Sequence, residues 1–104
     1  MRTALLTGAT GFVGGHVARD LLEHGWAVRS LVRPESLGDG RLPPGCEPRP
    51  GDLRDAAAVR AAVAGADAVF HVAARYSLAR RRAADVWRTN VDGTRNVLDA
   101  AVAA

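Results

Sequence analysis

The sequence predicts an α/β fold built on a doubly wound parallel sheet, truncated to about four strands. Short apolar runs alternate along the chain with longer runs whose apolar residues recur at helical spacing. Strands that alternate with helices form parallel βαβ units with right-handed crossovers. Four runs have the length and composition of strands, whereas a complete doubly wound sheet has about six. The sequence therefore predicts the first part of such a sheet.

The first predicted unit is a buried strand over residues 4–7 and a helix over residues 11–24. The apolar positions expected on the inner face of this helix are Val13, Val17, Leu21 and Leu22. Gly25 is the expected end of the helix, because glycine accepts the left-handed backbone that closes many helices. A second strand is expected over residues 27–32, followed by a proline- and glycine-rich loop over residues 34–45.

A weak third strand is expected near residues 46–50. Pro48 and Pro50 cannot donate hydrogen bonds to a neighbouring strand, so this strand belongs at an edge of the sheet. Asp55 is the predicted N-cap of a helix that runs to Ala64. The inner positions expected for that helix are Val59 and Val63.

A fourth strand over residues 68–72 and a last helix over residues 84–103 complete the pattern. The inner face expected for the last helix is formed by Trp87, Val91, Thr94, Leu98 and Ala101. These residues follow one another at steps of four and three, which is the spacing of a helix that lies on a sheet.

Composition narrows the classes of function. The 104 residues suit one domain at most, and the 14 basic residues are all arginine, with a formal net charge of +3. Because only Arg80, Arg81 and Arg82 form a run, a basic nucleic-acid-binding domain is not favoured. Cys46, the single cysteine, allows no intrachain disulfide and is expected in a loop or at a strand end. No run approaches the ~18 apolar residues of a membrane span, and no signal peptide is evident, so we expect a cytoplasmic protein.

The most informative segment lies between the first strand and the first helix, where three glycines follow a G-x-x-G-x-x-G spacing. Gly8 would allow the tight exit from the strand, and Gly14 would let helix and strand pack closely. Gly11 would let the backbone approach a pyrophosphate, which the free amides and the dipole of the helix start attract. The spacing and its context predict a Rossmann-type dinucleotide-binding loop, as opposed to a glycine-rich turn without a ligand.

Four motifs in order resemble those of the extended short-chain dehydrogenase/reductases: residues 7–14, 51–53, 69–74 and 90–98. Within that superfamily the chain is similar to the NAD-dependent epimerase/dehydratase group. It is most similar to hopanoid-associated sugar epimerases and dihydroflavonol-reductase-like proteins. The resemblance covers nearly the whole chain but only about the first third of such a protein. It implies that residues 1–104 are an N-terminal NAD(P)-binding Rossmann domain, incomplete and without the substrate domain.

The resemblance also implies roles for individual residues in binding the cofactor. The pyrophosphate would lie on Gly8, Thr10, Gly11, Phe12, Val13 and Gly14. Asp52 and Leu53 would contact the adenine, the carboxylate accepting its exocyclic amine; alternatively, Asp52 is a turn or capping residue. The nicotinamide side would be lined by Val72, Ala73 and Ala74.

Arg33 ends the second strand, where an acidic residue would bind the ribose hydroxyls of NAD. An arginine at this place suits the 2′-phosphate of NADP through charge-assisted hydrogen bonds. NADP is therefore favoured over NAD, although Arg33 could also be one more solvated arginine.

The catalytic pair of the family is absent from this chain. Its chemistry needs a tyrosine with a lysine four residues later, because the lysine lowers the pKa of the tyrosine. The sequence contains no lysine, and Tyr76 follows the fourth strand instead of the fifth. Asn90 would be the helix asparagine that supports the catalytic lysine through water; alternatively, it is a helix-surface amide. His71 is interpreted as a packed, hydrogen-bonded side chain, and the three histidines as no metal set.

The sequence thus predicts the NAD(P)-binding part of an epimerase, dehydratase or reductase. The whole enzyme would transfer hydride between nicotinamide and a sugar nucleotide or a small carbonyl substrate, and it could be a homodimer. This chain alone is expected to be inactive. A non-catalytic NADP-sensing module is the alternative, and a basic nucleic-acid-binding domain a third possibility that predicts steep salt dependence.

Overall fold

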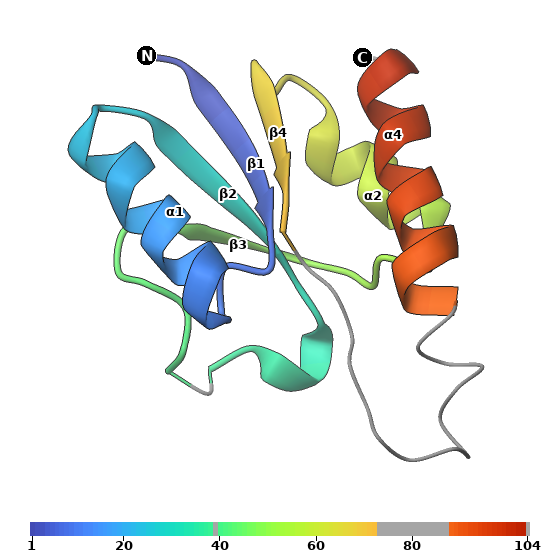
Figure 1. Ribbon diagram of the computed structural model, residues 1–104, viewed down its shortest axis with the longest axis horizontal. Coiled ribbons are helices and arrows are strands. Elements are labelled where there is room, and N and C mark those ends of the chain that lie inside the picture. Colours follow the sequence, from blue (N-terminus) through green and yellow to red (C-terminus); the bar gives the residue numbers. More distant parts are fainter. Residues whose placement is uncertain (39, 73–87, 104) are drawn as a thin grey trace.

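The computed structural model describes residues 1–38, 40–72 and 88–103 (Figure 1). These residues form one sheet of four parallel strands in the order β3-β2-β1-β4. The strands are β1 (Thr3–Thr7), β2 (Ala27–Val32), β3 (Glu47–Pro50) and β4 (Ala68–His71). The fold class and the four strands predicted from the sequence are confirmed. Within the described part of the chain, the proline-containing β3 lies at an edge of the sheet, as predicted.

The helices cover the two faces of the sheet. Figure 1 shows α1 (Phe12–Glu23) on one face and both α2 (Ala56–Val63) and α4 (Gly93–Ala103) on the other. β1 is buried from Ala4 to Thr7 and supplies side chains to both layers, since Leu5 packs with α2 and α4 while Ala4 and Leu6 pack with α1. An unbroken apolar run is what a parallel strand buried on both faces requires.

The first helix differs from the prediction in the side chains that it buries. Val13 was expected to face inward, but it is 61 % exposed. The buried residues of α1 are Gly14, Gly15, Ala18 and Leu21, so the residues that face the sheet near the start of the helix are small. Close contact between the helix start and the loop after β1 turns the glycines toward the sheet. Val13 is consequently left at the surface.

Asp55 is the N-cap of α2, as predicted from the sequence. The Asp55 carboxylate accepts hydrogen bonds from the backbone N–H groups of Ala57 and Ala58, at 3.0 and 3.2 Å. At the other end, Arg29 of β2 donates to the backbone carbonyls of Ala62 and Ala64. This second contact was not predicted from the sequence, and it satisfies carbonyls that the helix itself leaves without a hydrogen-bond donor.

The last helix has a different inner face from the one predicted. A π-helical turn, η3 (Arg88–Asp92), precedes α4, and residues 84–87 of the predicted helix lie outside the described residues. Leu98 is 60 % exposed. The buried residues of α4 are Gly93, Val97 and Ala100, each one residue before a position that was predicted to face inward. Contact with Leu53 sets this rotation, because a Cβ on Gly93 would lie only 2.9 Å from the Leu53 Cβ. The Asn96 side chain also donates to the Leu53 carbonyl at 2.8 Å.

Candidate functional site

A cleft of about 640 Å³ lies where the parallel strands end, between the loop after β1 and the loops after β2 and β3. In a doubly wound sheet, ligands bind in the crevice beyond the carboxyl ends of the strands. Every predicted cofactor residue that the structure describes lines this cleft: Gly8, Thr10, Gly11, Phe12, Val13, Gly14, Arg33, Asp52, Leu53 and Val72. Ala73 and Ala74 lie outside the described residues. The sequence reasoning missed further lining residues, namely Thr7, Leu31, Val32, Ser36, Arg41 and Gly51.

Two glycines shape the loop between β1 and α1. Gly8 has a φ of 86°, in the left-handed region that glycine accepts without strain. The Gly11 N–H donates to the Gly8 carbonyl at 3.0 Å and closes the turn. A Cβ on Gly14 would lie 1.8 Å from the Gly8 carbonyl oxygen, so only glycine fits where α1 passes the loop. Gly8 and Gly14 thus have the structural roles expected from the motif.

The start of α1 opens into the cleft. Gly11 is the N-cap, no side chain among the described residues caps the helix, and its first turn contains no acidic residue. The first backbone N–H groups of a helix have no partner within it and carry a partial positive charge. The side chains of Phe12 and Val13, at the rim of the cleft, are 83 % and 61 % exposed. This end of the cleft can accept an anion on backbone amides.

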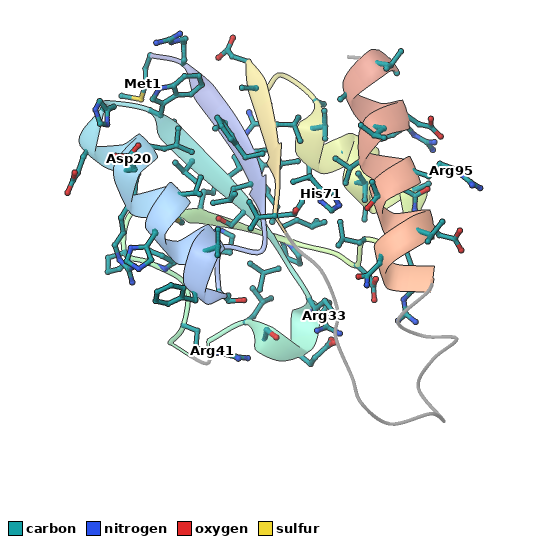
Figure 2. The ribbon with its side chains drawn as sticks, in the orientation of Figure 1. Met1, Asp20, Arg33, Arg41, His71 and Arg95 are labelled. Atoms are coloured by element: carbon teal, nitrogen blue, oxygen red, sulfur yellow. The ribbon has the colours of Figure 1, made fainter. Side chains whose placement is uncertain are left out.

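Positive side chains line the cleft beyond the end of β2. Figure 2 shows Arg33 and Arg41 on the side of the molecule where the strands end. The Nε of Arg33 lies 3.8 Å from an Oε of Glu35, and both side chains are largely exposed. A solvent-exposed pair at this distance contributes little, so the Arg33 guanidinium can exchange Glu35 for an anionic ligand. Ser36 adds a hydroxyl to the same region.

Asp52 lines the cleft from the loop after β3, the strand next to β2. Its carboxylate accepts from the backbone N–H of Arg54 at 2.9 Å and from the Arg54 guanidinium at 2.9 and 3.2 Å. These bonds hold the pKa of the Asp52 carboxyl below its usual value. Asp52 is therefore an ionised acceptor at neutral pH, and it also forms the turn that the sequence allowed as an alternative.

Comparison with known proteins decides the family. Residues 4–104 match the sequence profile of the NAD dependent epimerase/dehydratase family. The chain belongs to this family. A dihydroflavonol 4-reductase-like protein of Synechocystis is 43 % identical over 93 residues, which cover 89 % of this chain and 27 % of the relative. A 3 beta-hydroxysteroid dehydrogenase/Delta 5-->4-isomerase of Mycobacterium tuberculosis is 41 % identical over 104 residues, which cover 92 % of this chain and 27 % of that protein.

A solved structure of a short-chain dehydrogenase/reductase superfamily protein from Agrobacterium tumefaciens, with bound NAD, has the same fold. It superposes with a TM-score of 0.82 and 36 % identity, over 98 % of this chain and 29 % of that one. The chain thus spans less than a third of the length of these relatives. The comparisons confirm two predictions: the family resemblance inferred from the four sequence motifs, and the Rossmann-type fold.

In this member of the epimerase/dehydratase family, His71 at the end of β4 is hydrogen-bonded through both ring nitrogens. Its Nδ1 lies 2.7 Å from the Thr7 Oγ1 and its Nε2 lies 2.9 Å from the Thr94 Oγ1. Burial lowers the pKa of His71. The interpretation as a packed, hydrogen-bonded side chain is confirmed. Asn90 is half-buried in the π-helical turn before α4, and Tyr76 with Arg80–Arg82 lies outside the described residues.

Cys46 is half-buried just before β3, where burial raises the pKa of its thiol, as expected for an unreactive strand-end cysteine. Within residues 1–38, 40–72 and 88–103, no three His, Cys, Asp or Glu side chains gather as a metal site would need. Among the helices described there, none is long and apolar enough to cross a membrane.

His71 predicts how stability depends on pH. Because burial lowers the pKa of folded His71 below its ordinary value of about 6.5, the unfolded chain binds this proton first as the pH falls. The contribution to the free energy of unfolding is present above about pH 6.5 and is lost as the pH falls through the folded pKa. His24 has the opposite effect on how stability depends on pH, since hydrogen bonding to the Asp20 backbone raises its pKa.

Urea unfolding of the wild type and His71→Gln, at about pH 7.5 and about pH 5.5, isolates the contribution of His71. The wild type is expected to lose more stability on acidification than the variant, because His24 is common to both. Equal losses would show that folded His71 titrates like an exposed histidine.

Proposed function

We propose that residues 1–104 form the N-terminal NAD(P)-binding domain of an epimerase, dehydratase or reductase. The whole protein would transfer hydride between nicotinamide and a sugar nucleotide or small carbonyl substrate. One observation carries this proposal: nine residues from the sequence motifs, together with Arg33 at the end of β2, line a single cleft at the carboxyl ends of the strands. The bound NAD in the Agrobacterium relative supports the same assignment. A homodimer and a cytoplasmic location stay predictions for the whole protein.

The residues of the cleft fit an extended dinucleotide. The uncapped start of α1, around Phe12 and Val13, would bind the pyrophosphate through backbone N–H groups. Asp52 would accept the exocyclic amine of the adenine, and buried Leu53 would lie against the ring. Val72 would line the nicotinamide side with Ala73 and Ala74. When bound, the cofactor would accept or return the hydride, while these residues hold it in one orientation.

We further propose that NADP binds more tightly than NAD. Arg33 directly follows β2, and Arg41 and Ser36 line the same cleft. The 2′-phosphate of NADP is a compact anion that arginine binds through two parallel hydrogen bonds. Two arginines and a hydroxyl at one end of the cleft are therefore better suited to NADP than to the uncharged ribose hydroxyls of NAD.

The corresponding prediction concerns Arg33→Asp. This change removes a charge-assisted contact, worth roughly 1.5–3 kcal/mol, so NADP affinity is expected to fall about tenfold or more while NAD affinity changes little. Calorimetric titration with both dinucleotides measures the ratio. Arg95→Asp, the same charge change on the exposed surface of α4 away from the cleft, is the matched control. If the wild type binds the two dinucleotides equally, Arg33 does not recognise the 2′-phosphate.

Residues 1–104 alone are expected to have no catalytic activity. Because residues 1–104 contain no lysine, they cannot supply the tyrosine–lysine pair that this family uses for proton transfer. The purified 104-residue chain with NADPH and a carbonyl substrate is expected to show no cofactor oxidation above background. Loss of NADPH absorbance would report turnover. Stereospecific oxidation by this chain alone would contradict the assignment of catalysis to residues outside it.

A further inference from the structure

A continuous line of hydrogen bonds runs from the cleft to the turn before α4. The Val72 N–H is shared between the Thr7 backbone carbonyl, at 3.2 Å, and the Thr7 Oγ1, at 3.1 Å. The Thr7 Oγ1 also lies 2.7 Å from the His71 Nδ1. On the other side of the ring, the His71 Nε2 lies 2.9 Å from the Thr94 Oγ1, which donates to the Asn90 backbone carbonyl at 2.5 Å. Figure 2 shows His71 between the sheet and α4. We call these five residues the His71 relay.

The direction of each bond in the His71 relay follows from counting protons. A threonine hydroxyl has one proton, and that of Thr94 is donated to Asn90. Only a lone pair of Thr94 is left to face His71, so the His71 Nε2 must carry hydrogen. In a neutral imidazole the Nδ1 is then an acceptor, and it receives the proton of the Thr7 hydroxyl. A lone pair of the Thr7 hydroxyl then accepts the Val72 N–H.

The neutral ring is consistent with its surroundings. Burial lowers the pKa of His71 and so favours the neutral form. Thr7 is 1 % exposed, so a hydroxyl without a partner at this place would cost stability. The His71 relay therefore satisfies the buried Thr7 hydroxyl and holds the His71 ring through both of its nitrogens.

We propose that His71, as the neutral tautomer with hydrogen on Nε2, is a positioning residue that aligns the cleft wall at Thr7 and Val72 with the turn that carries Asn90. This inference rests on the proposed dinucleotide-binding function. Thr7 and Val72 line the cleft, whereas Asn90 sits in a π-helical turn, a local geometry often found at functional sites. His71 connects the two across β1, β4 and α4. Loss of the connection would let the wall and the turn move independently.

The first test is nuclear magnetic resonance of the wild-type protein with ¹⁵N-labelled histidine, in its full encoded length. Long-range proton–nitrogen correlations report which ring nitrogen carries the proton, and the signal missing from His71→Gln identifies His71. The expected result is a protonated Nε2 and an unprotonated Nδ1. A protonated Nδ1 would overturn the proposal, because the Thr7 hydroxyl could then no longer donate to the ring.

The second test separates positioning from a purely structural role. Thr94→Val removes the hydroxyl at nearly constant shape, while Thr94→Ser retains it. Thr94→Val is expected to weaken NADP binding roughly five- to tenfold, as loss of one or two hydrogen bonds implies, and Thr94→Ser to bind as the wild type does. A structural role alone would lower the melting temperature of Thr94→Val and leave the NADP dissociation constant of its folded form unchanged.

The outcomes distinguish the two proposals. If the wild type binds NADP and Thr94→Val binds it equally well, the positioning role of His71 is refuted and the proposed function stands. If the wild type binds neither NADP nor NAD, the proposed function is refuted and the positioning role with it. Should Thr94→Val fail to fold, His71→Gln titrated with NADP replaces it, with the same fivefold or larger weakening expected.

Discussion

Of the two glycines in α1, Gly14 is the one whose replacement by alanine is expected to destabilise the protein strongly. The new Cβ would lie 1.8 Å from the Gly8 carbonyl oxygen, 2.4 Å from its carbon and 3.0 Å from the Ala9 nitrogen. All three are backbone atoms, so no side-chain rotation can relieve the overlap. Either the loop after β1 or the whole of α1 must move. The expected cost is at least about 3 kcal/mol, the upper end of ordinary overpacking, in a domain whose total stability is of order 5–15 kcal/mol.

Gly15→Ala is the matched control for this change. Its Cβ would meet the Ala9 carbonyl oxygen at 3.4 Å and the mobile end of the Arg19 side chain at 3.5 Å, which are ordinary contacts. Alanine is also favoured over glycine inside a helix by about 1 kcal/mol. Urea unfolding followed by circular dichroism should find Gly15→Ala close to the wild type and Gly14→Ala strongly destabilised or unfolded. Similar stabilities of the two variants would mean that α1 does not pass the loop as closely as described.

The sequence was sufficient where local chemistry decides the structure. Asp55 caps α2 through its own neighbours, and Gly25 closes α1 with a positive φ. The prolines of β3 identified an edge strand because they remove hydrogen-bond donors. The glycine spacing located one end of the cleft, since it describes a backbone path that few other residues can follow.

Contacts between distant segments decide what the sequence did not predict. The rotation of α4 follows from Gly93 and Asn96 meeting Leu53, about forty residues earlier in the chain, and an apolar pattern contains no record of that contact. The position of Arg41 at the cleft depends on the path of a loop rich in glycine and proline. The His71 relay joins β1, β4 and α4 through Thr7 and Thr94. Because threonine is common in both strands and helices, neither residue indicates this contact in the sequence.

The second large effect is expected for Gly11→Ala, and here it concerns binding. Gly11 has a φ of −88° and a ψ of 176°, an extended backbone that alanine adopts freely. Its Cβ would find only the Gly8 carbonyl oxygen within contact distance, at 3.4 Å. The fold therefore does not need glycine at this position. Gly11 nevertheless lines the cleft beside the open amides of α1, where the pyrophosphate is proposed to lie.

A methyl group on Gly11 would occupy the space that a phosphate oxygen needs. The expected result is a folded variant whose affinity for NADP is lower by about thirtyfold or more, which corresponds to about 2 kcal/mol of steric cost. Gly15→Ala adds the same methyl group on the same helix, outside the cleft, and should bind NADP as the wild type does.

Calorimetric titration of NADP into the wild type, Gly11→Ala and Gly15→Ala, in the full encoded length, tests the proposed phosphate-binding loop most directly. Circular dichroism of the same samples establishes that all three are folded. We expect NADP to bind to the wild type and to Gly15→Ala, and little or not at all to Gly11→Ala. A folded Gly11→Ala that binds NADP as tightly as the wild type would show that this loop does not hold the pyrophosphate.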